Sequence, residues 1–144
     1  MKKICILISI CLILCVGCDN RVYYWEFAQE SSLVKEFKIV DSTGDLKHTV
    51  IGIIDIELID EFYSDIASLE MNKYGWNLAT PTGLCFMIVF ENEDYDLIAF
   101  KESKHHRYEN GQLISYNSWL RCNLEEFDKL INKYLKFAEG GIIN

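Results

Sequence analysis

"LCFMIVF", residues 84–90, is an unbroken apolar run of strand length in the second half of the chain. Seven residues are too few for a typical helix, and a strand without polar alternation is covered on both of its sides. This stretch therefore predicts the central strand of a sheet, and the neighbouring segments are interpreted around it.

The segments that follow this strand predict an antiparallel meander. The polar residues 91–94 form a turn, and residues 95–101 return as the next strand. Two further strands are expected at residues 105–108 and 113–116. Asn110-Gly111 lies between them, and both residues tolerate the positive φ that a two-residue hairpin loop requires.

The segments that precede the central strand predict a second hairpin. Residues 33–40 alternate between apolar and charged side chains, which is typical of a half-buried strand. Residues 41–45 have turn chemistry, and the mainly β-branched residues 49–54 form the paired strand. The apolar face expected for the first strand consists of Leu33, Phe37 and Ile39.

Two segments predict amphipathic helices, because their apolar residues recur every three or four positions. The first follows Asp55, which caps its N-terminus, and is expected to end near Met71. The second follows Asn123, with Glu126 three residues later as in a capping box. The predicted buried faces are Ile56, Ile59, Phe62, Ile66 and Leu69 in the first helix and Leu124, Phe127, Leu130, Ile131, Tyr134 and Leu135 in the second.

The order of these elements predicts an α+β fold. We expect an antiparallel sheet of about five strands with two helices on one face, in the order ββαβββα and in one domain over residues 33–144. The loop expected at residues 72–83 holds Trp76 beside Gly75. Tryptophan is enriched at binding hot spots, so Trp76 is a candidate partner contact.

The N-terminus has the features of a secretory signal peptide. Lys2 and Lys3 give it a positive head, residues 4–16 are apolar except for Ser9, and the small Gly17 precedes the boundary. The apolar run is shorter than the roughly 20 residues that a membrane-spanning helix needs. Residues 1–17 are therefore assigned to a signal peptide.

The boundary Val16-Gly17-Cys18 resembles the lipobox of bacterial lipoproteins, with Cys15 standing where that family usually has leucine. The resemblance implies cleavage before Cys18, acyl chains on Cys18 and a stable membrane anchor in the cell envelope, facing the periplasm or the exterior. Asp19 resembles the inner-membrane retention signal of enteric Gram-negative lipoproteins. The alternative is an uncleaved anchor helix in which Cys18 is an ordinary thiol.

Residues 18–32 are expected to form a short tether between this anchor and the domain. Tyr23, Tyr24, Trp25 and Phe27 lie within it. We expect these aromatic residues to pack on the domain as a first strand. The alternative is that they rest at the membrane interface, where aromatic residues are enriched.

The chain expected after cleavage is strongly acidic. Of 14 Lys and Arg residues two leave with the signal peptide, so 12 remain against 22 Asp and Glu residues, a net charge of −10. This charge argues against nucleic acid as a partner, because nucleic-acid binding depends on basic side chains. It also leaves membrane attachment to the lipid. Two interpretations of the acidic surface remain, a basic protein partner and solubility alone.

Beyond Cys18 only Cys85 and Cys122 remain, and the sequence leaves two interpretations of this pair. An even number of cysteines in an oxidising compartment predicts one disulfide. Cys85 lies in the apolar central strand, which favours two buried thiols instead.

His105, His106 and Arg107 are the other candidate contact residues. Consecutive residues of a strand point to opposite faces, so the two imidazoles are badly placed to bind one metal ion. No phosphate-binding loop and no nucleophile elbow is present in the sequence. We therefore expect no metal, no cofactor and no catalytic residue, and interpret these residues as a basic contact patch.

These observations predict a lipid-anchored envelope protein with a non-enzymatic, protein-binding domain. A concrete version is an inhibitor or immunity-type lipoprotein that binds a basic protein by electrostatic steering. One alternative is a lipoprotein that maintains the envelope without a single partner. A second is a small-ligand binder or enzyme that uses residues 72–83 as a lid.

Overall fold

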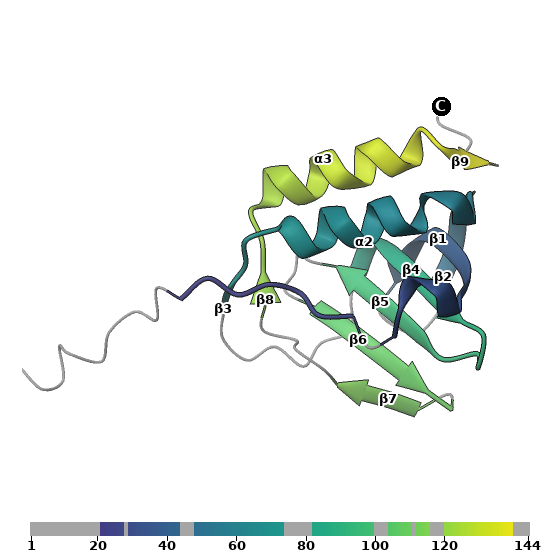
Figure 1. Cartoon of the computed structure of the whole chain (residues 1–144). Coiled ribbons are helices and arrows are strands. Elements are labelled where there is room, and N and C mark those ends of the chain that lie inside the picture. The colour runs from purple at the N-terminus through teal and green to yellow at the C-terminus, as the bar shows by residue number, and fades with distance from the viewer. Residues whose placement is uncertain are drawn as a thin grey trace, which may run out of the picture.

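The structure is a computed structural model, and it describes residues 21–27, 29–43, 48–73, 82–99, 104–110, 112–115 and 120–139. The helices α2 (Ile59–Ser68) and α3 (Leu124–Leu135) run antiparallel to each other on one side of a sheet (Figure 1). The short 3-10 helices η1 (Ser31–Leu33) and η2 (Ile56–Leu58) precede β1 and α2. The strands are β1 (Val34–Thr43), β2 (His48–Ile54), β3 (Asn72–Lys73), β4 (Thr82–Phe90), β5 (Tyr95–Ala99), β6 (Lys104–Glu109), β7 (Gln112–Ser115), β8 (Leu120–Arg121) and β9 (Ala138–Glu139).

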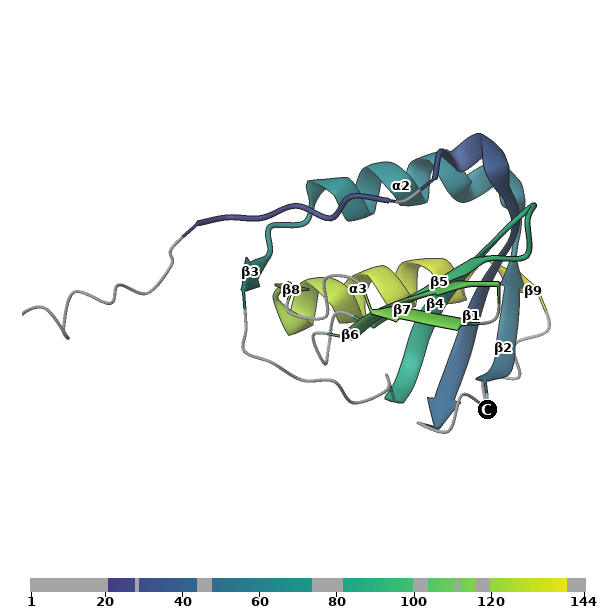
Figure 2. The ribbon, with the colours of Figure 1, turned by 90° about the horizontal axis from the view of Figure 1, so that it is seen from below.

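The main sheet is antiparallel throughout and has the order β7-β6-β5-β4-β1-β2-β9. β4 contains the "LCFMIVF" run and is the central strand, as predicted. The α+β fold with an antiparallel sheet and two helices is confirmed. β9 extends the sheet beyond the strands expected, and β3 and β8 form a separate two-stranded pair. Figure 2 shows how strongly the main sheet twists between β2 and β7.

The face of the sheet that meets both helices carries the main hydrophobic core. Phe86 of β4 lies at its centre, with ring centroids 4.8 Å from Phe62 of α2 and 5.8 Å from Tyr134 of α3. Phe37 of β1 lies 4.5 Å from Phe62. Ile59, Phe62 and Ile66 of α2 and Phe127, Leu130, Ile131 and Tyr134 of α3 are all buried, as the helical periodicity predicted. Ile56 was also expected on the buried face, but it lies in η2 and is 40% exposed, and Leu69, Leu124 and Leu135 are only partly buried.

The opposite face of the sheet holds a second, smaller cluster. Its buried members are Val40, Cys85, Leu97, Ala99 and Tyr108, with Met87 and Tyr95 packed against them. They alternate along the strands with residues of the main core, so that Cys85 precedes Phe86 and Leu97 precedes Ile98. β4 is therefore buried on both sides, which is why its sequence shows no polar alternation.

Several boundaries differ from those predicted. β1 continues through Thr43 into the segment expected to be a turn, because Asp41 and Ser42 pair with both β2 and β4. Leu33 lies in η1 and is exposed, since β1 begins at Val34 and Val34 takes the buried position. α2 ends at Ser68 rather than near Met71.

The ends of the loop expected at residues 72–83 belong to strands. Asn72 and Lys73 form β3, which pairs with β8, and β4 begins at Thr82. Trp76 lies outside the described residues. A strand of two residues has no periodicity, so its pairing partner, and not its own sequence, defines it.

The segment before η1 runs along α2 and is called the N-terminal strap (residues 21–27 and 29–30). At one end of α2, Tyr23 and Met71 exchange two backbone hydrogen bonds of 2.8 and 2.9 Å. Trp25 is only 4% exposed and belongs to the main core, and the Phe27 ring stacks on Tyr63 with centroids 3.7 Å apart. Tyr23, Trp25 and Phe27 therefore pack on the domain, through one bridge instead of the full strand expected, whereas Tyr24 is 54% exposed.

The strap reaches the start of α2 at its other end. The Tyr63 hydroxyl donates to the Gln29 carbonyl at 3.2 Å, and the Ser31 hydroxyl of η1 donates to the Asp60 carboxylate. Strap and helix therefore run in opposite directions, and the chain enters the domain where α2 ends. We call this the proximal end; it also holds β3, β8 and the start of α3 (Figure 1).

Candidate functional site

The basic patch predicted from the sequence lies on β6. The predicted strand is confirmed, and its register places His105 opposite Ile98 and His106 opposite Leu97 of β5. Ile98 belongs to the main core and Leu97 to the smaller cluster, so the two histidine positions lie on opposite faces of the sheet. In the part of the chain that the structure describes, no group of metal-ligating side chains is large enough to bind a metal ion.

Arg107 occupies a cross-strand position opposite Asp96. The Asp96 residue is only 1% exposed. A basic residue and a buried acidic residue thus occupy paired positions of the sheet, a relation that the sequence reasoning missed because it depends on strand register.

The disulfide considered between Cys85 and Cys122 is wrong for this structure. Both residues carry thiols and both are buried. Cys85 lies in the cluster on the second face, where its thiol donates to the Gly83 carbonyl at 3.3 Å. Cys122 lies in the main core on the other face of the sheet. The sheet separates the two side chains, so the second interpretation, two buried thiols, holds.

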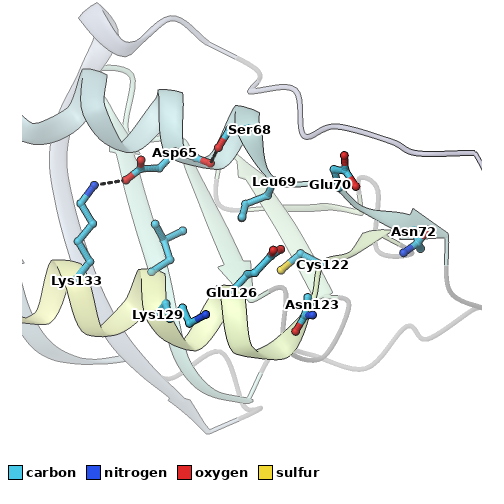
Figure 3. A pocket seen from close by; sticks show the side chains of 11 residues that line it. Asp65, Ser68, Leu69, Glu70, Asn72, Cys122, Asn123, Glu126, Lys129 and Lys133 are labelled. Atoms are coloured by element: carbon cyan, nitrogen blue, oxygen red, sulfur yellow. Dashed lines mark hydrogen bonds and ion pairs between the residues drawn. The ribbon is translucent and has the colours of Figure 1, made fainter.

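A groove with a volume of about 930 Å³ lies between α2 and α3 and extends to the proximal end, where Asn72 and Asn123 line it (Figure 3). The charged residues that line this helix groove are Asp65 and Glu70 from the α2 side and Glu126, Lys129 and Lys133 from α3. Asn123, which caps α3 by accepting from the Glu125 amide at 2.9 Å, lies at its mouth. The cap was predicted from the sequence, but the groove depends on how the two helices are placed.

The two helices are joined across this groove by a small charged network. The Lys133 ammonium donates to the Asp65 carboxylate at 2.6 Å and pairs with Glu61 at 2.6 Å. The Tyr134 hydroxyl donates to the same Asp65 oxygen at 2.8 Å. The hydrogen bond to Asp65, followed by that to Glu61, raises the pKa of Lys133. Burial, followed by the bond to Asp65, raises the pKa of Tyr134. Lys133 therefore stays positive and neutralises part of the acidic face of α2.

A second hollow, of about 430 Å³, lies at the opposite end of the domain and is called the distal hollow. Ile53 and Phe137 line it although they are 54% and 50% exposed. Asp55 and Glu57 stand beside them, and the Asp55 carboxylate accepts the Glu57 amide at 3.0 Å. Its remaining lining residues are Ile54 and Leu58. The site thus combines exposed apolar surface with two carboxylates.

The second face of the sheet holds one polar side chain whose position the sequence did not indicate. The His48 ring of β2 lies 6.2 Å from the Tyr95 ring of β5, edge to face, and Tyr95 stacks on Tyr108 at 4.3 Å. Neither ring nitrogen of His48 has a hydrogen-bond partner among the described residues. Burial lowers the pKa of His48, which keeps the imidazole neutral. Burial also raises the pKa of Tyr108, to about 12, with the nearby Tyr95 adding to the shift.

The helix groove and the distal hollow differ in what they can bind. In the helix groove, the charges of Asp65 and Lys133 already pair with each other. In the distal hollow Ile53 and Phe137 are each about half exposed, and a partner that supplies an apolar side chain would bury them. The carboxylates at its rim favour a partner with basic residues beside that side chain.

Comparison of the chain with protein-family models, with curated proteins and with solved structures finds no match. Among the described residues, no helix has both the length and the apolar character needed to span a membrane.

Proposed function

We propose that this chain is a lipid-anchored envelope lipoprotein whose single α+β domain binds a protein partner and is not an enzyme. The acyl chains are attached at Cys18, and the partner is a basic protein. An inhibitor or immunity-type protein is the concrete form of this proposal, since a domain held at the membrane can intercept an incoming basic toxin or hydrolase.

The observation that carries the proposal is the distal hollow. Ile53 and Phe137 expose apolar surface at the end of the domain opposite the point where the N-terminal strap enters. Apolar surface of this kind is typical of interaction sites when polar residues surround it. Asp55 and Glu57 are the polar residues beside this apolar surface, and their negative charges favour a positively charged partner.

The acidic character of this end supports a basic partner. η2 and the first turn of α2 carry acidic residues and no Lys or Arg. The turn between β4 and β5 adds Glu91, Glu93 and Asp94, of which Glu93 pairs with Lys35. Such a surface accelerates association with a basic protein and makes the rate sensitive to salt.

The anchoring half of the proposal is tested with Cys18→Ser in the full chain. We expect the unmodified protein to co-sediment with membranes and the variant to be released into the soluble fraction, with a mass that lacks the acyl chains. Membrane association of the variant equal to that of the unmodified chain, with the leader removed, contradicts the anchor.

The binding half is tested by placing a photo-crosslinking amino acid at Phe137 in cells and identifying the captured protein. We expect one basic protein, lost with Ile53→Ser and weakened at high salt. The matched control is the crosslinker at Ile114, an exposed apolar residue of β7 outside the distal hollow. Equal capture at both positions, or none at Phe137, contradicts the proposed binding surface.

A further inference from the structure

We infer that the proximal end of the domain rests against the lipid surface to which Cys18 is attached, so that the membrane fixes the orientation of the domain. This inference rests on the proposed lipid anchor and goes beyond it. It assigns a membrane-contact surface to residues of the strap, β3 and β8, and it places the distal hollow on the side away from the bilayer.

The first argument is the reach of the chain. Tyr23 follows Cys18 by five residues, and an extended chain spans at most about 3.6 Å per residue, or about 18 Å in all. A domain on so short a connection stays within its own diameter of the membrane. Free tumbling relative to the bilayer needs a much longer flexible linker.

The second argument is that the N-terminal strap is fixed in place where it first contacts the domain. The two backbone hydrogen bonds between Tyr23 and Met71 fix the strap to the proximal end. Trp25 is buried in the main core two residues later, and Met71 itself is fully buried. Lengthening the connection would require Trp25 to leave the core, which exposes a large apolar side chain to water. The proximal end is therefore the part of the domain nearest to the anchor.

The third argument is the chemistry of the strap on either side of Tyr23. Val22 is 47% exposed and Tyr24 is 54% exposed, whereas Trp25 is buried. Tyrosine is favoured at membrane interfaces, because its ring enters the headgroup region while its hydroxyl stays hydrated. These two residues lie where the short connection would bring them to a lipid surface.

The fourth argument is the distribution of formal charge between the residues of the two ends. The proximal end balances three basic residues, Arg21, Lys73 and Arg121, against three acidic ones, Glu70, Glu125 and Glu126. The distal end is acidic, because Asp55, Glu57 and Asp60 near the start of α2 and Glu91, Glu93 and Asp94 in the β4–β5 turn outnumber its basic residues Lys35 and Lys136. An anionic membrane repels the distal end and not the proximal one.

The orientation has a direct consequence for the two hollows. α3 runs from the proximal end to the distal end over 12 residues, a length of about 18 Å. The mouth of the helix groove at Asn123 then faces the bilayer, and Phe137 beyond the end of α3 faces away from it. A protein arriving from outside the membrane meets the distal hollow first.

The test uses the lipidated full chain in vesicles of phosphatidylcholine and phosphatidylglycerol that contain a lipid with a nitroxide on its headgroup. A bimane fluorophore is attached at Asn72→Cys on β3 or at Lys136→Cys at the end of α3, both exposed positions. Cys85 and Cys122 are buried, and labelling of the unmodified chain provides the background. We expect several-fold stronger quenching at position 72 than at position 136.

Two variants sharpen this test. Insertion of about 12 Gly and Ser residues between Asn20 and Arg21 gives the domain freedom to tumble, so the difference in quenching should disappear. The double substitution Val22→Ser and Tyr24→Ser should reduce quenching at position 72, whereas Ile114→Ser on β7 should not.

The outcomes separate this inference from the proposal on which it rests. Vesicle flotation is measured on every sample. Equal quenching at positions 72 and 136 in protein that floats with the vesicles overturns the orientation and leaves the lipid anchor intact. Protein that fails to float overturns both. Stronger quenching at position 72 that survives the linker insertion overturns the role of the short connection.

Discussion

The two faces of the sheet bury their side chains in different ways. On the face covered by the helices, Phe86 lies 4.8 Å from the Phe62 ring and 5.9 Å from the Phe127 ring. On the other face the neighbouring Cys85 lies among smaller side chains, with Tyr108 the largest of the buried cluster. The first face is built from aromatic rings carried by separate elements, and the second from residues that the strands themselves supply.

The polar groups on the two faces also differ in whether a facing helix supplies a hydrogen-bond partner. On the helix-covered face the Tyr134 hydroxyl donates to Asp65 of the facing helix. On the second face, neither His48 ring nitrogen has a hydrogen-bond partner among the described residues, and the ring contacts Tyr95 instead. A facing helix supplies both apolar rings and polar partners. The comparison therefore indicates that the helix-covered face provides most of the stability.

The substitution Phe86→Ala tests this conclusion most severely. It removes a ring that contacts both helices and leaves a cavity that their fixed positions prevent from closing. We expect the free energy of unfolding to fall by about 3–5 kcal/mol. Urea denaturation followed by circular dichroism measures this change. The exposed Phe137→Ala should cost far less, and similar losses for the two variants would contradict the assignment of the core.

Leu97→Ala makes the corresponding change on the second face. Leu97 is fully buried, but its cluster has fewer members than the main core and lies on the face of the sheet opposite the two helices. We expect a loss of about 2–3 kcal/mol, at the lower end of the range for such changes. If the two faces are independent, the losses for Phe86→Ala and Leu97→Ala add to within about 0.5 kcal/mol in the double variant. A loss at Leu97 larger than that at Phe86 would reverse the comparison.

The central strand and both helices could be predicted from the sequence because their signals are local. The run at residues 84–90 identified β4, and the positive φ of 50° at Asn110 matches the hairpin predicted there. Asn123 caps α3 as predicted, whereas the Asp55 carboxylate caps η2, and α2 itself begins after Leu58 without a side-chain cap.

The candidate sites could not be predicted in the same way, because they depend on residues distant in the sequence. The distal hollow combines Ile53 with Phe137, which come together only when the two-residue β9 pairs with β2. The helix groove similarly depends on Lys133 meeting Asp65. The disulfide was considered on the even number of cysteines and an oxidising compartment, and neither carries information on the face of the sheet that each residue occupies.

Gly52→Ala tests how tightly the helix-covered face is packed at its edge. A Cβ atom at Gly52 of β2 would lie 2.5 Å from the Cβ atom of Ala138 in β9, which is far inside contact distance. We expect a loss of about 1–3 kcal/mol, typical of overpacking. Ala138→Gly removes the opposing atom, so the double variant should regain much of the loss. Absence of this rescue would mean that β9 does not pack on Gly52.

The substitution Tyr134→Phe removes one hydrogen bond from the helix-covered face and keeps the packing of the aromatic ring. Asp65 keeps its ion pair with Lys133, so no buried charge loses all its partners. We expect a loss of about 1 kcal/mol, the usual contribution of a single hydrogen bond. The variant Asp65→Asn should cost more, because it also removes the charge that pairs with Lys133. Thermal unfolding of the two variants measures the difference.

The substitution His48→Phe tests the His48 imidazole of the second face through the dependence of protein stability on pH. Burial lowers the pKa of His48 in the folded state below its ordinary value of 6.5, so below that pH the unfolded chain binds more protons than the folded one. The stability of the unmodified protein should therefore fall as the pH drops below 6.5, by an amount additional to the titration of the carboxylates. A phenylalanine ring at this position has no ionisable group, so the variant should lack this component while keeping a ring against Tyr95.

The dependence of stability on pH in the unmodified protein and in His48→Phe also shows whether water reaches the second face of the sheet. Denaturation midpoints measured between about pH 8 and pH 5, on either side of the ordinary histidine pKa, should diverge toward the acidic end. Parallel curves would mean that the imidazole is solvated in the folded state, and the second face would then not be a closed apolar surface at β2. A divergence would instead show that water is excluded from the His48 ring where it meets Tyr95, on the face of the sheet opposite α2 and α3.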